Sequence, residues 1–406
     1  MSKNIYTTPL TITSQFAFCG LPLRLDSYAG CAFRCSFCFA RYRGGNNSDN
    51  SVRPANPQLL GRVFERALNS EPTKQGVIAQ FLRRRVPIHF GGMSDPFQPA
   101  EARYRITKSF LRVLSKHKYP TVISTRGSMV ASQPYIDLLR QIENVVVQFS
   151  FSSTRDPTAR LVEPFSTQPS ELLRAMNDLS CQGINVTCRW QPYIQGLSEP
   201  ASEFLSRVAS TGCHHVGFEH LKLPVERQNT LWGILSRGVG KDLYEEYKKL
   251  GGTRDGREYV LPVRHKLPKI LEVAAFARSH GMTFGAADNE LQSFSDTDCC
   301  CSGVDQFPGF ENWFKYQIAY AIRKCRGKPI TYSSISREWS PSGSIDRFLN
   351  ANSRLSTKSE SAGTLRDHIR TRWNNVTSPG SPSSFYGVVP TSKFTSSGQR
   401  VYKWSS

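Results

Sequence analysis

Three cysteines near the N-terminus, Cys31, Cys35 and Cys38, are spaced four and then three residues apart, and Phe37 precedes the last of them. Thiolate is the usual protein ligand of iron–sulfur clusters. A loop of this length can direct three thiolates to one 4Fe–4S cluster, which leaves one iron open to hold a small molecule. The alternatives are a zinc site or three buried cysteines. Structural zinc loops pair two cysteines with a downstream pair or with histidines; no second C-x-x-C pair exists, so the spacing favours a cluster.

A second run, Cys299-Cys300-Cys301, has no equally clear interpretation. Adjacent side chains of an extended segment point to opposite faces, so the three thiols do not easily bind one metal. One or two of them can serve an auxiliary iron–sulfur cluster together with Cys325, Cys181 or Cys188. The alternative is that they are small buried apolar side chains.

The composition indicates a globular protein with a polyanionic partner. The chain has 406 residues and is 39% hydrophobic, enough for one large domain and a smaller one. Lys and Arg number 52 against 32 Asp and Glu, a net charge of +20. Such an excess favours nucleic acid, DNA or RNA, as a partner, although a soluble protein can simply be basic.

Targeting signals are not apparent. The sequence contains no run of eighteen apolar residues, so no membrane span is expected, and the first residues lack a basic-then-apolar signal pattern. We therefore expect a cytoplasmic protein. In a reducing cytosol, the 11 cysteines indicate metal ligands or reactive thiols rather than disulfides.

Strand and helix patterns alternate from residue 23 to about 295. This alternation predicts βαβ units, a parallel sheet and a full or partial β/α barrel of six or seven units. The cysteine loop follows the first strand, and sites in such barrels gather at the carboxyl ends of strands. The predicted strands are Leu23–Tyr28, Val86–Phe90, Thr121–Thr125, Val145–Phe151, Asn185–Trp190, His215–Glu219 and Thr283–Ala287. The predicted domains are a lead-in (1–22), the barrel (23–295), a cysteine-rich segment with a connecting helix (296–327) and a basic domain (328–406).

The last fifth of the chain carries half of the net charge, with fourteen Lys/Arg and four Asp/Glu in 321–406. Short helices are expected at Gly343–Asn350 and Ala362–Asn374, and a helix containing Trp313, Phe314 and Tyr316 is expected to end near Cys325. A hairpin is expected from Phe385–Val389 and Arg400–Trp404. This order resembles a winged helix-turn-helix with Thr364–Trp373 as recognition helix. A basic disordered tail is the alternative.

Several later motifs accompany the cysteine loop: Gly91-Gly92, the segment Ser94–Glu101 with Tyr104–Thr107 after it, Leu161–Pro164, and Arg189–Pro192 followed by Gly196. Together with C-x-x-x-C-x-x-C they resemble the spore photoproduct lyase-like branch of the radical S-adenosylmethionine (SAM) superfamily over about residues 23–225. The resemblance implies a partial barrel of the (β/α)6 type. It also implies an enzyme in which a 4Fe–4S cluster, fed by a reductant such as flavodoxin or ferredoxin, cleaves SAM to a 5′-deoxyadenosyl radical.

The resemblance also implies residue roles. Cys31, Cys35 and Cys38 would hold the cluster, and Gly91-Gly92 would meet the SAM amino group through a close backbone approach. Arg126, Ser150, Ser152 and Arg189 are candidates for the SAM carboxylate by position, although each can also be ordinary strand polarity. Asp95 and Gln98 are expected above the barrel, where Asp95 is a candidate catalytic residue, although Asp-Pro is also common in turns. His89 is expected to be a packed core histidine, and Asp288-Asn289-Glu290 to line the barrel's mouth.

The basic tail and the cysteine run depart from the lyase pattern, so repair of thymine dimers does not carry over. In the lyase a cysteine donates a hydrogen atom to a substrate radical, and Cys299, Cys300 or Cys301 is a candidate for that role here. We expect an enzyme that repairs or modifies nucleic acid. Two alternatives remain: a radical SAM enzyme acting on a peptide or protein, and a DNA-binding regulator whose cluster senses iron or oxygen.

Overall fold

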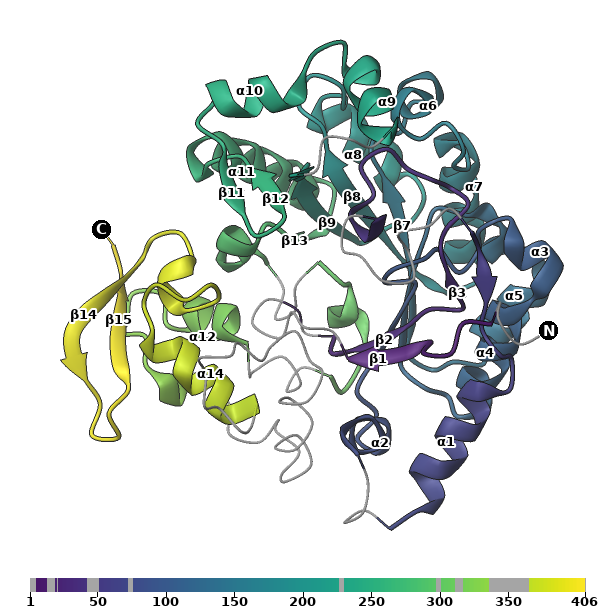
Figure 1. Cartoon of the computed structure of the whole chain (residues 1–406), viewed down its shortest axis with the longest axis horizontal. Coiled ribbons are helices and arrows are strands. Elements are labelled where there is room, and N and C mark those ends of the chain that lie inside the picture. Colours follow the sequence, from purple (N-terminus) through teal and green to yellow (C-terminus); the bar gives the residue numbers. More distant parts are fainter. Residues whose placement is uncertain are drawn as a thin grey trace.

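The computed structural model describes residues 5–12, 19, 21–41, 51–71, 76–225, 230–296, 301–310, 317–335 and 365–405. One eight-stranded sheet runs through it, in the order β1 (Leu10–Ile12), β2 (Leu23–Leu25), β5 (Ile88–Phe90), β6 (Thr121–Thr125), β7 (Val145–Phe151), β8 (Asn185–Tyr193), β9 (His215–His220) and β13 (Thr283–Ala286). β1 pairs antiparallel with β2, and every later pair is parallel. This curved, mostly parallel sheet confirms the expected α/β partial barrel (Figure 1).

Helices cover the outside of this sheet (Figure 1). They are α1 (Leu59–Asn69), α2 (Val77–Arg83), α3 (Ala100–Tyr104), α4 (Ile106–Lys116), α5 (Gln133–Leu139), α6 (Asp156–Val162), α7 (Pro169–Cys181), α8 (Ala201–Ala209) and α11 (Val263–Ser279). In α7 the buried residues Leu172, Ala175, Met176 and Leu179 recur at helical spacing, which turns one apolar face to the sheet. Gly183 follows α7 with a φ of +73°, the left-handed conformation that glycine adopts readily after a helix.

The layer between sheet and helices is apolar and aromatic. Trp190 of β8 is fully buried and stacks on Phe204 of α8, with ring centroids 3.7 Å apart. Phe218 of β9 meets the same indole edge-on at 5.3 Å. These outward side chains alternate along each strand with inward ones, so the strands fix which residues face the barrel interior.

Between β9 and α11 lies an insertion that the sequence analysis did not predict. It contains α9 (Thr230–Val239), α10 (Leu243–Lys249) and a small antiparallel sheet of β10 (Leu223–Pro224), β12 (Glu258–Val260) and β11 (Thr253–Asp255). Its core includes Leu223, Leu235, Leu243 and Leu261. Strands of two or three residues are too short to give an alternating pattern, which is why periodicity did not reveal them.

Residues 301–310, with the short helix η6 (Val304–Gln306), lie inside the barrel. Val304 and Phe307 are buried together with Val122 of β6 and Val146 of β7. The Gln306 Nε2 donates to the Thr187 hydroxyl of β8 at 2.9 Å, and Gly303 also packs against that side chain. The segment that follows the last barrel strand therefore returns to fill the barrel interior.

The C-terminal module, which we define as residues 317–335 and 365–405, is folded. It contains α12 (Ile318–Lys324), η8 (Tyr332–Ser334), α14 (Leu365–Asn374), η9 (Pro382–Ser384) and the hairpin β14 (Val388–Phe394) and β15 (Arg400–Trp404) (Figure 1). The hairpin is confirmed, but its first strand is Val388–Phe394 rather than the predicted Phe385–Val389. Trp373 and Tyr402 are fully buried, and the indole donates to the Arg400 carbonyl at 2.8 Å.

Other predictions for this region are open. Gly343–Asn350 and the residues Trp313, Phe314 and Tyr316 lie outside the described residues, and the winged-helix assignment and the domain boundaries stay predictions. No helix in the described ranges is long and apolar enough to cross a membrane.

Candidate functional site

The cysteine loop lies between the two-residue strand β3 (Tyr28–Ala29), which pairs with β4 (Arg53–Pro54), and the short helix η1 (Phe39–Arg41). Burial raises the pKa of the Cys31 thiol well above its usual value, and that of Cys35 to about 12. The charges of Asp95, Cys35 and Cys38 raise the pKa of Cys31 further. Thiolates at such positions need a positively charged partner, and metal coordination deprotonates thiols outright. This donor set fits an iron–sulfur cluster, which takes one thiolate per iron.

Gln98 holds the first half of this loop. Its carboxamide is fully buried, accepts from the Ala32 amide at 2.8 Å and donates to the Gly30 carbonyl at 3.1 Å. These two backbone groups flank Cys31. The second half is held by Ser36, whose amide and hydroxyl both donate to the Val162 carbonyl at the end of α6.

The segment that carries Gln98 is itself anchored. Ser94 donates its hydroxyl to the Tyr28 carbonyl at 2.6 Å. Glu101 is fully buried and accepts from the Tyr28 and Tyr135 hydroxyls and from the first amides of α4, at Thr107 and Lys108. A carboxylate at a helix N-terminus satisfies amides that lack partners within the helix. The Ser94–Glu101 motif therefore forms the support of the cysteine loop.

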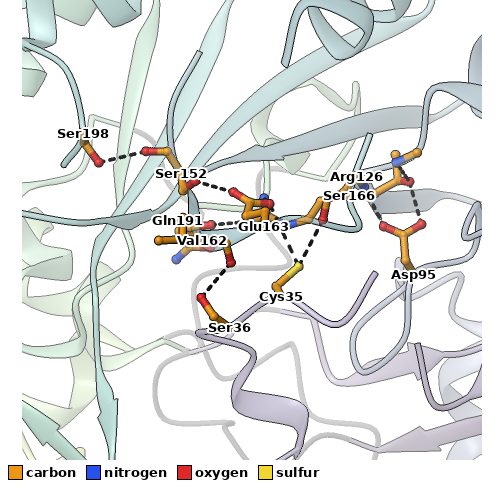
Figure 2. Close-up of polar contacts among 12 residues, drawn as sticks. Cys35, Ser36, Asp95, Arg126, Ser152, Val162, Glu163, Ser166, Gln191 and Ser198 are labelled. Carbon is orange, nitrogen blue, oxygen red and sulfur yellow. Dashed lines mark hydrogen bonds and ion pairs between the residues drawn. The ribbon is translucent and has the colours of Figure 1, made fainter. Parts of the chain in front are cut away.

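A second network surrounds Cys35 (Figure 2). Glu163, after α6, accepts from the Ser152 hydroxyl and the Arg126 guanidinium, and its Oε2 lies 4.0 Å from the Cys35 sulfur. Arg126 also donates to the Gln191 carbonyl at 2.7 Å, and its guanidinium lies over the Phe37 ring, 5.1 Å from the centroid. The arginine thus spans the loop aromatic, the carboxylate and the end of β8.

Asp95 lies beside this network. Its Oδ1 accepts from the Phe97 amide and the Thr125 hydroxyl, and its Oδ2 from the Arg126 amide at 2.5 Å (Figure 2). Burial raises the pKa of Asp95 to about 6, against the lowering effect of these donors. The carboxylate fixes the turn after β6, which favours a positioning role; its predicted catalytic role stays a prediction.

Gly91 and Gly92 follow β5. Gly91 has a φ of +94°, and a Cβ there would lie 2.4 Å from the Ser124 carbonyl oxygen. At Gly92 a Cβ would meet the Arg24 side chain at 2.5 Å. The chain therefore requires glycine at position 91, whereas a side chain at position 92 would displace the Arg24 side chain. The contact of Gly91 and Gly92 with a SAM amino group stays a prediction.

The strand register places Ser150, Ser152 and Arg189, three of the predicted site residues, at the barrel interior. Ser150 of β7, Arg189 of β8 and Gly217 of β9 are consecutive register partners, and alternation along the strands puts Ser152 and Gln191 one step nearer the carboxyl ends. Gln191 donates to Glu219 of β9 at 2.6 Å. We call this end of the barrel, where Ser152, Gln191 and Glu219 lie, its mouth.

Cys301 lies in the same layer of the interior. A Cβ on Gly217 would come within 2.7 Å of the Cys301 Cβ, so the cysteine packs where a larger residue would stand. The Gln148 carboxamide donates to the Cys301 carbonyl at 2.6 Å and accepts from Ser124, which contacts His89 at 2.7 Å. His89 thus takes part in a polar chain across the interior.

No family model matches the chain. Uncharacterized proteins of Mycobacterium tuberculosis and Mycobacterium bovis are 25% identical over 240 residues, which is 57% of this chain and 68% of theirs. Spore photoproduct lyase complexed with dinucleoside spore photoproduct superposes with a TM-score of 0.50 at 14% identity, over 68% of this chain and 80% of that one. A lyase mutant with bound AdoMet and the same dinucleoside matches at the same score and identity, over 68% and 79%.

The chain has the fold of spore photoproduct lyase. The resemblance that the motifs indicate is thereby confirmed at the level of the fold. At this identity a shared fold does not by itself fix the substrate.

Within this lyase fold the interior contains polar atoms without protein partners. Among the described residues, the Arg189 Nε and the Gln191 Oε1 are buried and make no hydrogen bond. Buried polar groups are nearly always paired, so orphans at the inner side of β8 fit a polar ligand at the mouth. The guanidinium of Arg189 suits a carboxylate such as that of SAM.

The cysteines considered as partners of the cysteine run in an auxiliary cluster lie on different parts of the structure. Cys181 is exposed on α7, Cys188 faces the outer side of β8, and Cys325 contacts Ser334 at 3.1 Å. Cys301 lies on the inner side of the sheet, so these three do not form a site with it; Cys299 and Cys300 lie outside the described residues.

Asp288 does not line the mouth as an open carboxylate. It is buried, 2.7 Å from His220 Nδ1 and 3.5 Å from Lys266 Nζ. Burial by itself would raise the pKa of Asp288, but His220, Lys266 and Lys222 hold it well below the usual value. Lys266 also pairs with Glu290, so this group joins β9, α11 and the helix η5 (Asn289–Phe294).

The sequence analysis gave no site role to Glu163, Gln191 or Glu219. Glu163 was visible only as part of the Leu161–Pro164 motif, since it follows a helix rather than a strand. Gln191 and Glu219 were detectable by counting alternate residues beyond Arg189 and Gly217 toward the strand ends.

Proposed function

We propose that the protein is a radical SAM enzyme that acts on nucleic acid. Cys31, Cys35 and Cys38 would hold a 4Fe–4S cluster; SAM would lie at the barrel mouth between Gly91-Gly92 and the inner side of β7 and β8. When bound and reduced, by flavodoxin or ferredoxin in the cytoplasm, these groups supply a 5′-deoxyadenosyl radical. The observation that carries the proposal is the anchoring of a three-cysteine loop by Gln98 at the mouth of a lyase-type barrel.

The residues of this chain perform distinct tasks in the proposal. Gln98 and Ser36 fix the loop, so that the three sulfurs keep their geometry. Arg189 and Ser150 face the interior and would orient the SAM carboxylate. Arg126 and Glu163 form an ion pair beside Cys35, in which each of the two buried charges has its partner.

Anaerobic reconstitution with iron and sulfide, followed by dithionite and SAM, tests the enzyme. We expect 5′-deoxyadenosine, and none from the Cys35→Ala variant, whereas Cys181→Ser, at an exposed thiol on α7, retains full yield. An intact cluster without 5′-deoxyadenosine would refute the proposal and favour a sensing regulator. Adding pools of DNA, RNA or peptide separates the substrate classes, since the true substrate acquires a new mass.

Cys301 is our candidate for hydrogen-atom donor to a substrate radical. Its placement against Gly217, in the layer of Ser150 and Arg189, supports this role. In the donation the Cys301 S–H bond breaks, a C–H bond forms on the substrate, and the unpaired electron stays on sulfur. In deuterated water the exchanged thiol would deliver deuterium to the product.

The Cys301→Ser variant should still make 5′-deoxyadenosine but should lose deuterium incorporation, and Cys325→Ser serves as the matched control. Deuterium incorporation that persists in Cys301→Ser would exclude Cys301 and leave Cys299 and Cys300 as candidates.

A further inference from the structure

The described C-terminal module is almost free of acidic residues. It contains ten Lys and Arg against a single acid, Asp367. Six of the cations are exposed, at Lys324, Arg326, Lys328, Arg370, Lys393 and Lys403. A compact surface with so little compensating negative charge attracts a polyanion.

The hairpin adds aromatic rings to this charge. At its tip the Arg400 guanidinium lies 4.6 Å from the centroid of Phe394, whose side chain is 53% exposed. At its base Arg326 lies 5.3 Å from the centroid of Trp404. The two pairs are four residues apart along β15, about 13 Å at strand rise, the span of about four stacked nucleotides.

The helix α14 is less suited to read a duplex. Its Ile369 and Trp373 are buried against the rest of the module, and Arg372 donates to Ser378 at 3.2 Å and to the Pro379 carbonyl. The hairpin, by contrast, leaves Phe394 exposed with a cation beside it. Exposed rings next to cations are the usual platform for unstacked bases.

The module is fixed to the rim of the barrel. The Tyr386 amide donates to the Glu290 carbonyl of η5 at 2.8 Å, and its ring lies 6.2 Å from Phe294. Arg323 donates to the Gln292 carbonyl of the same helix at 3.2 Å. The Tyr386 ring is 45% exposed, and η5 directly follows Asp288 at the end of β13. The module therefore contacts the barrel through the short helix that follows its last strand.

We infer that the hairpin side of the C-terminal module, defined by Arg326, Tyr386, Phe394, Arg400 and Trp404, binds single-stranded nucleic acid by stacking bases and pairing phosphates. This inference rests on the proposed function, since it names the form of the nucleic acid and the residues that deliver it. A base already unpaired reaches a buried mouth without the cost of extrusion from a duplex.

The test measures fluorescence anisotropy of a labelled thymidine oligonucleotide of about 16 residues with the full-length protein at low salt. Phe394→Ala and Tyr386→Ala should each weaken binding about 5- to 150-fold. Tyr104→Ala is the matched control, because Tyr104 is 40% exposed and lies 5.1 Å from an arginine, Arg103, on α3 of the barrel. Its affinity should stay within about twofold of the parent, since only rings of the binding surface stack bases.

Salt dependence gives an independent readout. Arg326→Gln and Arg400→Gln, at the two cations of this surface, should each reduce the slope of log affinity against log salt by about 0.7, the value for one phosphate of a single strand. Circular dichroism melting of each variant checks that the fold is kept.

Equal binding by Phe394→Ala, Tyr386→Ala and the parent would overturn the inference, as would tighter binding of a duplex of the same sequence. The 5′-deoxyadenosine assay on the parent protein, without nucleic acid, reports the proposed function separately. If 5′-deoxyadenosine is absent but the variants show the expected binding pattern, the proposed enzyme function is refuted and the nucleic-acid-binding surface is supported.

Discussion

Replacing Glu163 by glutamine removes a negative charge from the side of the proposed cluster while nearly keeping the shape of the side chain. The Glu163 carboxylate lies 4.0 Å from the Cys35 sulfur and neutralises Arg126. In Glu163→Gln the arginine keeps its charge, so the potential at Cys35 becomes more positive. Reduction adds an electron to the cluster, and the midpoint potential should therefore rise.

The distance sets the size of the effect. Two unit charges 4.0 Å apart interact by about 4 kcal/mol at an effective dielectric constant near 20, and by about 1 kcal/mol in water. For a one-electron couple, tenfold in the equilibrium constant is about 59 mV, so 1 kcal/mol corresponds to about 43 mV. We expect a rise of about 40 to 170 mV; the lower part of this range applies if the added electron is centred away from Cys35.

Anaerobic redox titration of the reconstituted protein, followed by electron paramagnetic resonance of the reduced cluster, measures this shift. Glu203→Gln on α8 is the matched control, because Glu203 also pairs with an arginine, Arg155, but belongs to a different helix and is partly exposed. It should leave the potential unchanged. A Glu163→Gln potential equal to that of the control, or lower than that of the parent, with full iron content, would refute the placement of Glu163 beside the cluster.

Three further perturbations test the support of the site. Gln98→Ala leaves the Ala32 amide and the Gly30 carbonyl without this partner, at a cost of about 1–3 kcal/mol each. Loss of iron to a chelator, followed by visible absorbance, should therefore accelerate tenfold or more. An unchanged rate would show that Gln98 does not hold the cysteine loop. Glu101→Ala removes the acceptor of four donors, including the first amides of α4, and should lower the free energy of unfolding in urea by at least about 3 kcal/mol, with Glu171→Ala on α7 as control. Asp288→Asn removes the buried carboxylate beside His220 and leaves Lys266 with Glu290 as its remaining acidic partner, and it should lower the free energy of unfolding by about 3–5 kcal/mol. Because the pKa of Asp288 is lowered in the folded protein, the ionised carboxylate contributes to the free energy of unfolding at pH values above its unfolded pKa of about 3.9. That contribution is lost as the pH falls below this value toward the lowered pKa of the folded state. The difference in free energy of unfolding between the parent and Asp288→Asn should thus be constant from about pH 7 to 5 and should decrease below about pH 4. A difference that increases on acidification would contradict the lowered pKa of Asp288.

The barrel was predictable because its strands are strongly patterned. Val145–Phe151 is a run of β-branched and aromatic residues, and Gly183 follows the helix before β8, so these units have clear limits. The 223–260 insertion gave no such signal, since its strands are two or three residues long. Its helices pack on one another and on α6 rather than continuing the βα repeat.

The site was predictable as a set of residues but not as a set of contacts. Spacing identified the three cysteines, and the motif resemblance indicated Gln98. The contact between Gln98 and the loop joins residues 66 apart, and only the fold brings them together. Arg126 shows the limit most clearly: its position after β6 predicts a SAM ligand, which stays a prediction, and nothing in the sequence indicated its contacts with Glu163 and the Gln191 carbonyl. Which partner an arginine takes depends on tertiary geometry that sequence spacing does not encode.

Residues 301–307, which follow the last barrel strand, take part in the packing of the barrel interior. Cys301 is held at Gly217 by close packing, and its carbonyl is held by Gln148. Further along the same segment, Val304 and Phe307 pack with Val122 and Val146 and form an apolar floor inside the barrel. Without residues 301–307 the open sheet would expose this floor and the polar chain from His89 to Gln148 to water. In the proposed function, a radical generated at the mouth would need a closed interior, because exclusion of water suppresses side reactions. The segment that follows the last strand is therefore structurally part of the barrel, and the basic module is attached to it through η5 at the same rim.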